Sequence, residues 1–187
     1  RQMCIRDSFS AIQNNDKIGV IFFSDRIEKF IPPKKGRKHI LYIIRELLEF
    51  KPESARTNIQ CAIEYLTNVL KKRCTAFMLS DFIDERDFQN ALTIANRKHD
   101  VVALQVYDRR LEELPDVGLM KVRDAETAHE QWIDTSSKSL RKTHHEWWKS
   151  RQQKLHEIFT HSNVDAVSVR TDQDYVKALL NLFAKRN

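Results

Sequence analysis

Glycine and proline are scarce in this chain, with 3 and 4 copies among 187 residues. Gly19, Gly36 and Gly118 stand too far apart to form a glycine-rich phosphate loop, which excludes the common nucleotide-binding motifs. No apolar run approaches the roughly 20 residues that a membrane-spanning helix needs, and no secretory signal precedes the predicted fold. We therefore expect a globular, charge-rich domain in the cytoplasm, without a membrane span in this chain.

Cysteine is also rare, and the three residues Cys4, Cys61 and Cys74 include no C-x-x-C pair. An odd number of scattered thiols does not indicate a disulfide framework or a zinc site. This pattern is typical of buried or incidental cysteines in a reducing compartment.

Positive charge is in excess, with a net charge of +6 and a pI near 9.3. The basic residues are scattered and mostly occupy expected loops and helix ends, where cations are favourable. Aromatic residues do not alternate with them as a single-stranded nucleic-acid platform requires. We therefore expect no nucleic-acid partner, while an acidic protein partner stays open.

Apolar β-rich runs alternate with segments of helical periodicity. The predicted strands are residues 18–23, 27–31, 74–79, 101–107 and 164–169, and Pro32 and Pro33 are expected to end the second. The predicted helices are residues 38–50, 58–72, 86–97, 136–160 and 172–185. Residues 119–122 and 131–134 predict a β-hairpin. This order predicts an α/β fold, an open and mostly parallel Rossmann-like sheet with helices on both faces and a small β-hairpin insertion.

Two predicted strands end in the same dipeptide, Ser24-Asp25 and Ser80-Asp81. The carboxyl ends of parallel strands form the edge where open α/β sheets bind ligands. No helix follows Ser24-Asp25, so we interpret that pair as a turn with a structural hydrogen-bonding role.

Asp81 is the more informative of the two acids. Asp84 stands nearer the next predicted helix, and Asp87 follows it at the spacing of a capping box, so the capping role is already filled. Asp81 is left free at a strand tip, where a carboxylate is a suitable ligand for a hard cation such as Mg²⁺.

Four segments in this order, KIGVIFFSD, ARTNIQCAIEYL, CTAFMLSDFID and HDVVALQVYD, together resemble a von Willebrand factor A-type domain. The stretches ELPDVGLMKVRDAET and WIDT narrow the resemblance to the bacterial family of unknown function number fifty-eight. That family is related to the BatA-type proteins encoded beside MoxR-like AAA+ ATPases. The resemblance runs from about Ser10 to the end of the chain.

The resemblance implies a metal-ion-dependent adhesion site on the strand-carboxyl edge. The family pattern is D-x-S-x-S after the first strand, a threonine before a mid-domain helix and an aspartate after the fourth strand. The threonine corresponds to Thr57 and the aspartate to Asp81. The implied cofactor is Mg²⁺ or another divalent cation, whose coordination a partner's carboxylate completes. Thr57 and Gln60 also match a T-x-x-Q capping box, so helix capping is an alternative role for Thr57.

The D-x-S-x-S motif is missing, and the stretch Asp7–Ser10 has the wrong spacing. Residues 1–8 resemble a translated sequencing adapter, and we interpret them as a non-native leader. Residues 9–187 are then the C-terminal portion of a single von Willebrand factor A-like domain, truncated before its first central strand. We expect this chain alone to bind Mg²⁺ weakly or not at all. We also expect exposed apolar surface beside residues 18–23 and 74–79.

Two other groups of residues allow competing interpretations. The acidic cluster is Asp81, Asp84, Glu85 and Asp87. It allows a metal-dependent hydrolase, although most of its members fit a helix N-terminus and no nucleophile–base pair stands nearby.

A second group lies in the long helix predicted near the C-terminus. His144-His145-Glu146 fits a solvated helix face better than a metal site, because adjacent helical residues point about 100° apart. Trp147 and Trp148 are expected to anchor this helix on the core, with an interaction site as the alternative.

The favoured hypothesis is a non-enzymatic protein–protein interaction module. Its binding would depend on a divalent cation in the full-length protein, and its expected partner, by resemblance, is a MoxR-type AAA+ ATPase. The alternative is a metal-dependent hydrolase that uses Asp81 and the neighbouring carboxylates.

Overall fold

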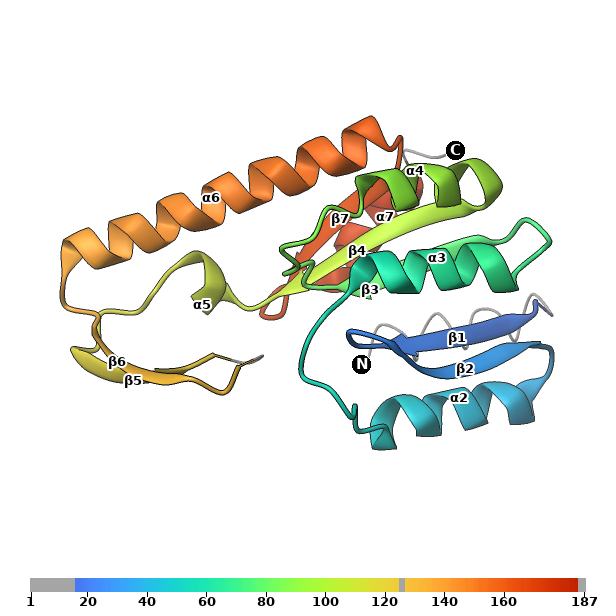
Figure 1. Ribbon diagram of the computed structural model, residues 1–187, viewed down its shortest axis with the longest axis horizontal. Coiled ribbons are helices and arrows are strands. Elements are labelled where there is room, and N and C mark those ends of the chain that lie inside the picture. Colours follow the sequence, from blue (N-terminus) through green and yellow to red (C-terminus); the bar gives the residue numbers. More distant parts are fainter. Residues whose placement is uncertain (1–15, 125–126, 185–187) are drawn as a thin grey trace.

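The structure is a computed structural model that describes residues 16–124 and 127–184 (Figure 1). Three predictions fall outside the described residues. They are the non-native leader at residues 1–8, the motif-like stretch 7–10 and the end of the last helix at residue 185.

A three-stranded parallel sheet forms the centre of the fold, in the order β3–β4–β7. Its strands are β3 (Thr75–Ser80), β4 (Asp100–Tyr107) and β7 (Asp165–Arg170). Residues 101–105 of the middle strand β4 are all buried, as expected for a strand that is covered on both faces. The prediction of an α/β fold with parallel strands is confirmed for this part of the chain.

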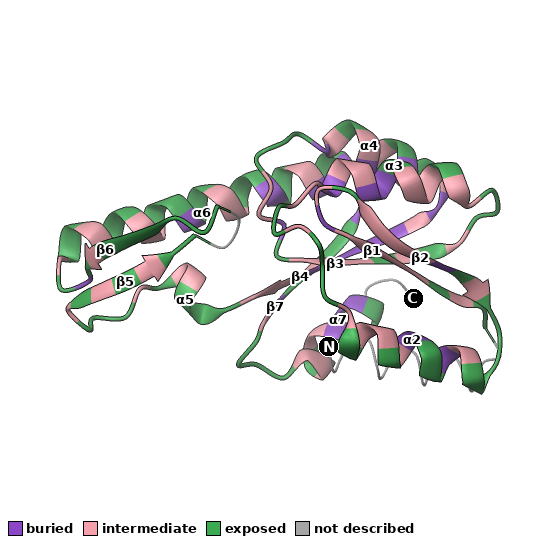
Figure 2. Cartoon of the chain, turned by 60° about the horizontal axis from the view of Figure 1, so that its bottom comes forward, coloured by how far each residue is buried: buried purple, intermediate pink, exposed green. Residues whose placement is uncertain are grey.

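Helices cover both faces of this sheet (Figure 2). They are α3 (Ile59–Val69), α4 (Gln89–Lys98), α6 (Lys138–His161) and α7 (Tyr175–Ala184). The first three form one apolar cluster with Val101 of β4, whereas Leu179 and Leu182 of α7 pack against Val102 and Leu104 on the opposite face. Alternate residues of β4 therefore serve two separate cores. No helix within the described ranges combines the length and the apolar character needed to cross a bilayer.

An antiparallel hairpin of β1 (Ile18–Phe23) and β2 (Ile27–Lys34) lies beside the parallel sheet. The helix α2 (Arg37–Glu49) follows it. The prediction that Pro32 and Pro33 end the second strand is wrong, because β2 includes both. Proline lacks an amide N–H and is tolerated in edge strands and at irregular pairing, and the register shifts near Gly19. A Cβ at Gly19 would stand 2.8 Å from the Ile31 carbonyl oxygen, so this close approach requires glycine.

The hairpin and the parallel sheet are separate sheets within the described residues. There, β1 pairs only with β2, and β3 pairs only with β4. Phe23 of β1 and Met78 of β3 nevertheless pack on the same apolar cluster beneath α3. Phe77 of β3 is 40% exposed, which agrees with the apolar surface expected beside residues 74–79. One continuous open sheet is not confirmed, and a further strand between β1 and β3 stays a prediction.

An arm extends away from the parallel sheet (Figures 1 and 2). It consists of α5 (Arg109–Glu112), β5 (Leu119–Arg123), β6 (Glu130–Asp134) and the N-terminal half of α6. The predicted β-hairpin is confirmed by the β5–β6 pairing, whereas the short helix α5 was not predicted.

Two histidines join α6 to α5. His144 Nε2 lies 2.9 Å from the Leu111 carbonyl oxygen, and His145 Nδ1 lies 3.2 Å from that of Glu112. Both histidines are half-buried, so the predicted solvated face is confirmed for exposed Glu146 but is wrong for His144 and His145. Their partners are carbonyl groups of the short helix α5.

The two tryptophans of α6 differ in their environment. Trp148 is buried and its ring centroid lies 5.0 Å from that of Tyr107, at the end of β4. Trp147 is 44% exposed. The predicted anchoring role is confirmed for Trp148 only.

We predict that His99 makes the stability of the fold depend on pH. His99 is fully buried at the end of α4, with Nδ1 3.5 Å from the Cys74 sulfur and Nε2 without a hydrogen-bond partner in the described part of the chain. Burial and, secondarily, the Lys98 charge lower the pKa of His99 below 6.5. The unfolded chain therefore takes up a proton at a higher pH than the folded chain, and stability falls as the pH drops below about 6.5 toward the folded-state pKa.

Urea unfolding at pH 7.5 and pH 5.5 measures this effect. In His99→Leu the difference between the two pH values should shrink, while the matched change at exposed His156, His156→Leu, should leave it unchanged. An equal loss of stability at low pH in the wild type and in His99→Leu would contradict the prediction.

Candidate functional site

Asp81 occupies the carboxyl edge of the parallel sheet, directly after β3. Its side chain is exposed, and its Oδ1 accepts a hydrogen bond from the Ile83 N–H at 3.0 Å. No described residue donates a hydrogen bond to the other carboxylate oxygen. Because ligands of open α/β sheets bind at this edge, Asp81 presents a largely uncommitted carboxylate where an external ligand is expected.

Asp84, three residues later, has a structural role. Its Oδ2 accepts a hydrogen bond from the N–H of Ile59, the first residue of α3, at 2.8 Å, and its Oδ1 accepts one from the Arg86 N–H at 3.0 Å. The prediction that Asp84 caps the following helix is wrong, because α4 begins only at Gln89, where Asp87 is the acceptor. Asp84 instead places a negative charge at the N-terminus of α3, where the helix dipole favours it.

Thr57 lies just before α3 and is half-buried. The N-cap of α3 is Asn58, whose Oδ1 accepts a hydrogen bond from the Cys61 N–H at 3.1 Å. The capping role considered for Thr57 is therefore wrong. Arg86 donates a hydrogen bond to the Thr57 carbonyl oxygen at 3.1 Å, which joins the Thr57 segment to the loop that carries Asp81. The structure thus brings the two segments together at one edge.

Ser24-Asp25 has the structural role that the sequence predicts. The pair lies in the turn between β1 and β2, and Ser24 is 6% exposed. Its hydroxyl donates to Glu28 Oε1 at 2.6 Å, and its carbonyl oxygen accepts from the Asn58 N–H at 2.8 Å. The Ser24 hydrogen bond, followed by that of the Glu53 N–H, lowers the pKa of Glu28 below 4.5. This turn therefore supports α3 from the hairpin side.

The sequence did not indicate a row of polar residues beneath Asp81, of which the middle one, Gln105, is buried. Ser80, Gln105 and Ser168 stand in register on β3, β4 and β7. Gln105 is 2% exposed, its Nε2 donates to the Asp81 carbonyl oxygen at 3.3 Å, and its Oε1 accepts from the Ser168 hydroxyl at 2.7 Å. The sequence feature that could have indicated this row is Gln105, the one amide side chain inside the apolar run VVALQVY. Because buried amides need partners, this row fixes the backbone at the Asp81 position.

The described residues supply only part of a divalent-cation site. Mg²⁺ favours six oxygen ligands, several of which are commonly water. Thr57 and Asp81 offer two side-chain oxygens on adjacent segments, whereas both oxygens of Asp84 already accept backbone hydrogen bonds. Within the described ranges, no group of three His, Cys, Asp or Glu residues is arranged to hold a metal ion. A complete site would need further ligands from elsewhere.

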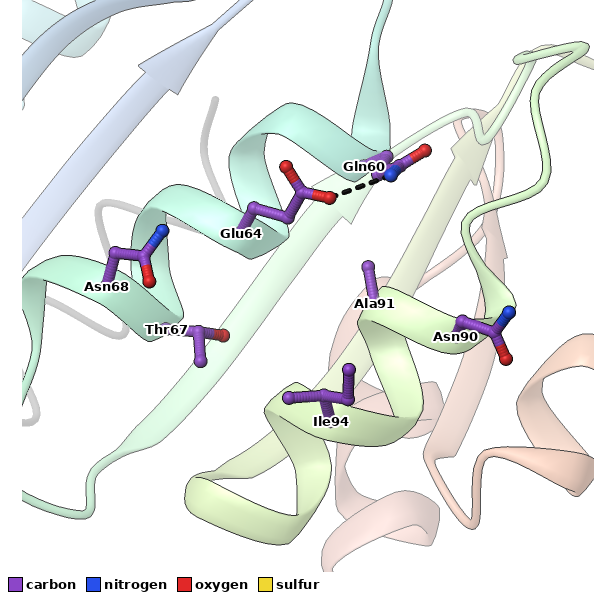
Figure 3. Close-up of a pocket in the computed structure, with 7 residues that line it drawn as sticks. All are labelled: Gln60, Glu64, Thr67, Asn68, Asn90, Ala91 and Ile94. Atoms are coloured by element: carbon purple, nitrogen blue, oxygen red, sulfur yellow. Dashed lines mark hydrogen bonds between the residues drawn. The ribbon is translucent and has the colours of Figure 1, made fainter.

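An open groove of about 290 Å³ lies between α3 and α4 (Figure 3). It is lined by Gln60, Glu64, Thr67, Asn68, Asn90, Ala91 and Ile94. Gln60 Nε2 donates to Glu64 Oε1 at 2.7 Å, so two of its polar groups satisfy each other. We therefore consider the groove a weaker candidate than the edge that carries Asp81.

Comparison with known protein sequences gives one family and several uncharacterized relatives. The family described as "Protein of unknown function DUF58" matches residues 2–154. An uncharacterized protein of Mycobacterium tuberculosis strain H37Rv is 25% identical over 175 residues, which are 91% of this chain and 54% of that protein. An uncharacterized protein of Mycobacterium avium is 26% identical over 160 residues, covering 83% and 93%. The chain spans about half the length of the first relatives that it matches.

Two solved structures are similar in fold. One is the conserved hypothetical protein BatB from Bacteroides thetaiotaomicron, with 16% identity, a TM-score of 0.57 and coverage of 98% of this chain and 86% of that chain. The other is an aerotolerance-related membrane protein from Bacteroides fragilis, with 15% identity, a TM-score of 0.58 and coverage of 98% and 88%. At these identities the likeness shows the fold alone.

We predict that the two acids of this loop differ in their contribution to stability. Asp84→Ala should lower the free energy of unfolding by about 1–2 kcal/mol, because it removes the acceptor for two backbone N–H groups, one at a helix N-terminus. Asp81→Ala removes an exposed acceptor of the Ile83 N–H and, at 3.5 Å, of the Ser80 hydroxyl, and should change the free energy of unfolding by less than about 0.5 kcal/mol. Chemical denaturation of the two variants and the wild type measures both values. A larger loss for Asp81→Ala than for Asp84→Ala would refute this assignment.

Proposed function

This chain belongs to that family of unknown function, and on this premise we propose that it is a non-enzymatic protein–protein interaction module. Its binding surface is the carboxyl edge of the β3–β4–β7 sheet, centred on Asp81. The observation that carries the proposal is the contrast between two acids of one loop. Both carboxylate oxygens of Asp84 accept backbone hydrogen bonds, one from Ile59 of α3 and one from Arg86 of the loop, whereas Asp81 is exposed and has one oxygen without a donor in the described residues. An exposed carboxylate on a well-supported backbone suits recognition by an outside group.

The support beneath Asp81 favours binding at this position. Gln105 holds the Asp81 carbonyl oxygen from below, and Arg86 joins the loop to Thr57. Such contacts reduce the freedom that the loop would lose on binding, and pre-organisation of this kind raises affinity. The side chain of Asp81 remains available because its backbone is held by other groups.

We further propose that the full-length protein binds its partner through a divalent cation. A Mg²⁺ ion at this edge would supply a positive charge with open positions for an acidic group of the partner. Thr57 and Asp81 are the residues of this chain that would hold it. The resemblance to proteins encoded beside MoxR-type AAA+ ATPases makes such an ATPase the first partner to test.

Capture of a MoxR-type ATPase from the same organism by the full-length protein tests this proposal. Capture should require Mg²⁺, be lost with EDTA and return when Mg²⁺ is added in excess. Asp81→Ala and Thr57→Ala should reduce capture about tenfold or more, because each removes a ligand or contact at the edge. Asp87→Ala, an exposed acid of the same loop that lies outside the proposed pair, is the matched control and should retain capture.

Two outcomes would overturn the proposal. Capture that is unchanged by both EDTA and Asp81→Ala would show that the edge is not used. Phosphatase or nuclease turnover that is abolished by Asp81→Asn would instead establish the metal-dependent hydrolase.

We also predict that the 187-residue chain alone binds Mg²⁺ more weakly than about the millimolar range, since it offers two ligands where Mg²⁺ favours six. Isothermal titration calorimetry with Mg²⁺ and then Mn²⁺ measures this directly. Millimolar or tighter affinity that disappears in Asp81→Ala would show that these two residues suffice.

A further inference from the structure

The residue that follows Asp81 has an unusual backbone conformation. Phe82 has a φ of 56°, in the left-handed region that residues other than glycine rarely adopt. A bulky residue keeps this conformation only when its surroundings hold it there. The conformation of Phe82 sets the direction of the turn that presents Asp81, so the groups that hold Phe82 also determine the geometry of the proposed binding edge.

Part of this support comes from near the loop itself. The Phe82 N–H donates to the Ser80 hydroxyl oxygen at 3.0 Å. The Phe82 side chain is 3% exposed, and its ring lies 6.3 Å from that of Phe88 and 5.1 Å from that of Phe159. These contacts fix the N–H and the side chain of Phe82, but they leave its carbonyl group to be satisfied by another element.

That other element is α6. One terminal nitrogen of Arg151, Nη2, lies 3.2 Å from the Phe82 carbonyl oxygen and 3.2 Å from the Asp84 carbonyl oxygen. A single guanidinium group, 67 residues or more away in sequence, therefore holds the carbonyl groups of the two residues that flank Ile83. Hydrogen bonds from a charged donor are stronger than neutral ones, and the planar guanidinium has a fixed geometry.

The position of Arg151 is itself supported within α6. Its guanidinium carbon lies 5.8 Å from the ring centroid of Trp147, one helical turn earlier. This is the distance of a cation–π contact, and it orients a side chain that would otherwise be mobile. The half-exposed Trp147 is therefore part of the same arrangement.

We propose that Arg151 is a positioning residue that couples α6 to the Asp81 turn. Arg151 holds Phe82 in its left-handed conformation, and α6 thereby sets the geometry of the proposed binding edge. Its relevance to partner binding rests on the function proposed above. The coupling itself is a property of the folded chain alone, and it is tested without any partner.

Hydrogen–deuterium exchange of the full-length protein, followed on peptides that cover residues 80–84, tests the coupling. Arg151→Gln should accelerate exchange there about tenfold, because the loop loses its two charge-assisted hydrogen bonds. Arg151→Lys should have an intermediate effect, since an ammonium group does not reproduce the planar donor geometry. Trp147→Leu is the second variant, which tests the coupling even if the Arg151 variants unfold, because Trp147 is half-exposed. It removes the cation–π contact and should accelerate exchange about twofold to threefold.

Lys154→Gln is the matched control, because it removes one positive charge from the same helix at a residue that forms no hydrogen bond or ion pair with residues 80–84 in the described part of the chain. Its exchange at residues 80–84 should equal that of the wild type, and residues 101–106 of β4 should be unaffected in every variant. Unchanged exchange at residues 80–84 in both Arg151→Gln and Trp147→Leu would overturn the proposal. Equal acceleration in β4 would also overturn it, because Arg151 would then support the whole fold rather than position the loop. Failure of ATPase capture with the expected exchange pattern would refute the proposed function and leave the coupling intact.

Discussion

The loop after β3 is joined to α3, β4 and α6, because its backbone polar groups need hydrogen-bond partners outside the sheet. At the carboxyl edge of a parallel sheet the backbone leaves its ladder, so its N–H and C=O groups need other partners. Here Asp84 reaches the first N–H of α3, Gln105 reaches the Asp81 carbonyl, and Arg151 reaches two further carbonyls. The three donors and acceptors come from positions 24 to 69 residues apart along the chain. The loop is consequently fixed by tertiary contacts, although it carries no regular secondary structure.

Elements with a strong periodic pattern could be predicted from the sequence, because their pattern reflects burial alone. The run VVALQVY is buried on both faces and reads as a central strand, and the long helix α6 was placed within two residues at its start. Capping residues were less predictable. Asn58 rather than Thr57 caps α3. In the first turn of the last helix, which was predicted to start at Asp172, the Val176 N–H donates to Asp174, whereas Asp172 pairs with Arg170. Several residue types are equivalent as caps, so local sequence does not decide between neighbours.

The two Ser-Asp pairs show the same limit at the candidate site. Both follow a strand, and the sequence places both at the carboxyl edge of a sheet. Ser24 enters a hairpin turn and becomes buried against Glu28, whereas Ser80 precedes a long loop and its hydroxyl accepts from Phe82. What separates them is the direction of the next element, which depends on packing. The role of Asp84 was unpredictable for the same reason, since its partner Ile59 lies 25 residues earlier.

A site for binding another protein needs groups that the fold itself does not use, and these must stand on a backbone that the fold holds firmly. Asp81 and Asp84 divide these two tasks. If Asp84 pointed to the solvent as Asp81 does, the first N–H of α3 would lose its carboxylate acceptor. The loop that carries both acids would also be held less firmly. A second committed acid in place of Asp81 would leave the edge with no exposed carboxylate at the strand tip. The left-handed Phe82 lies between the two, and its position lets one carboxylate face the solvent while the other reaches the neighbouring helix.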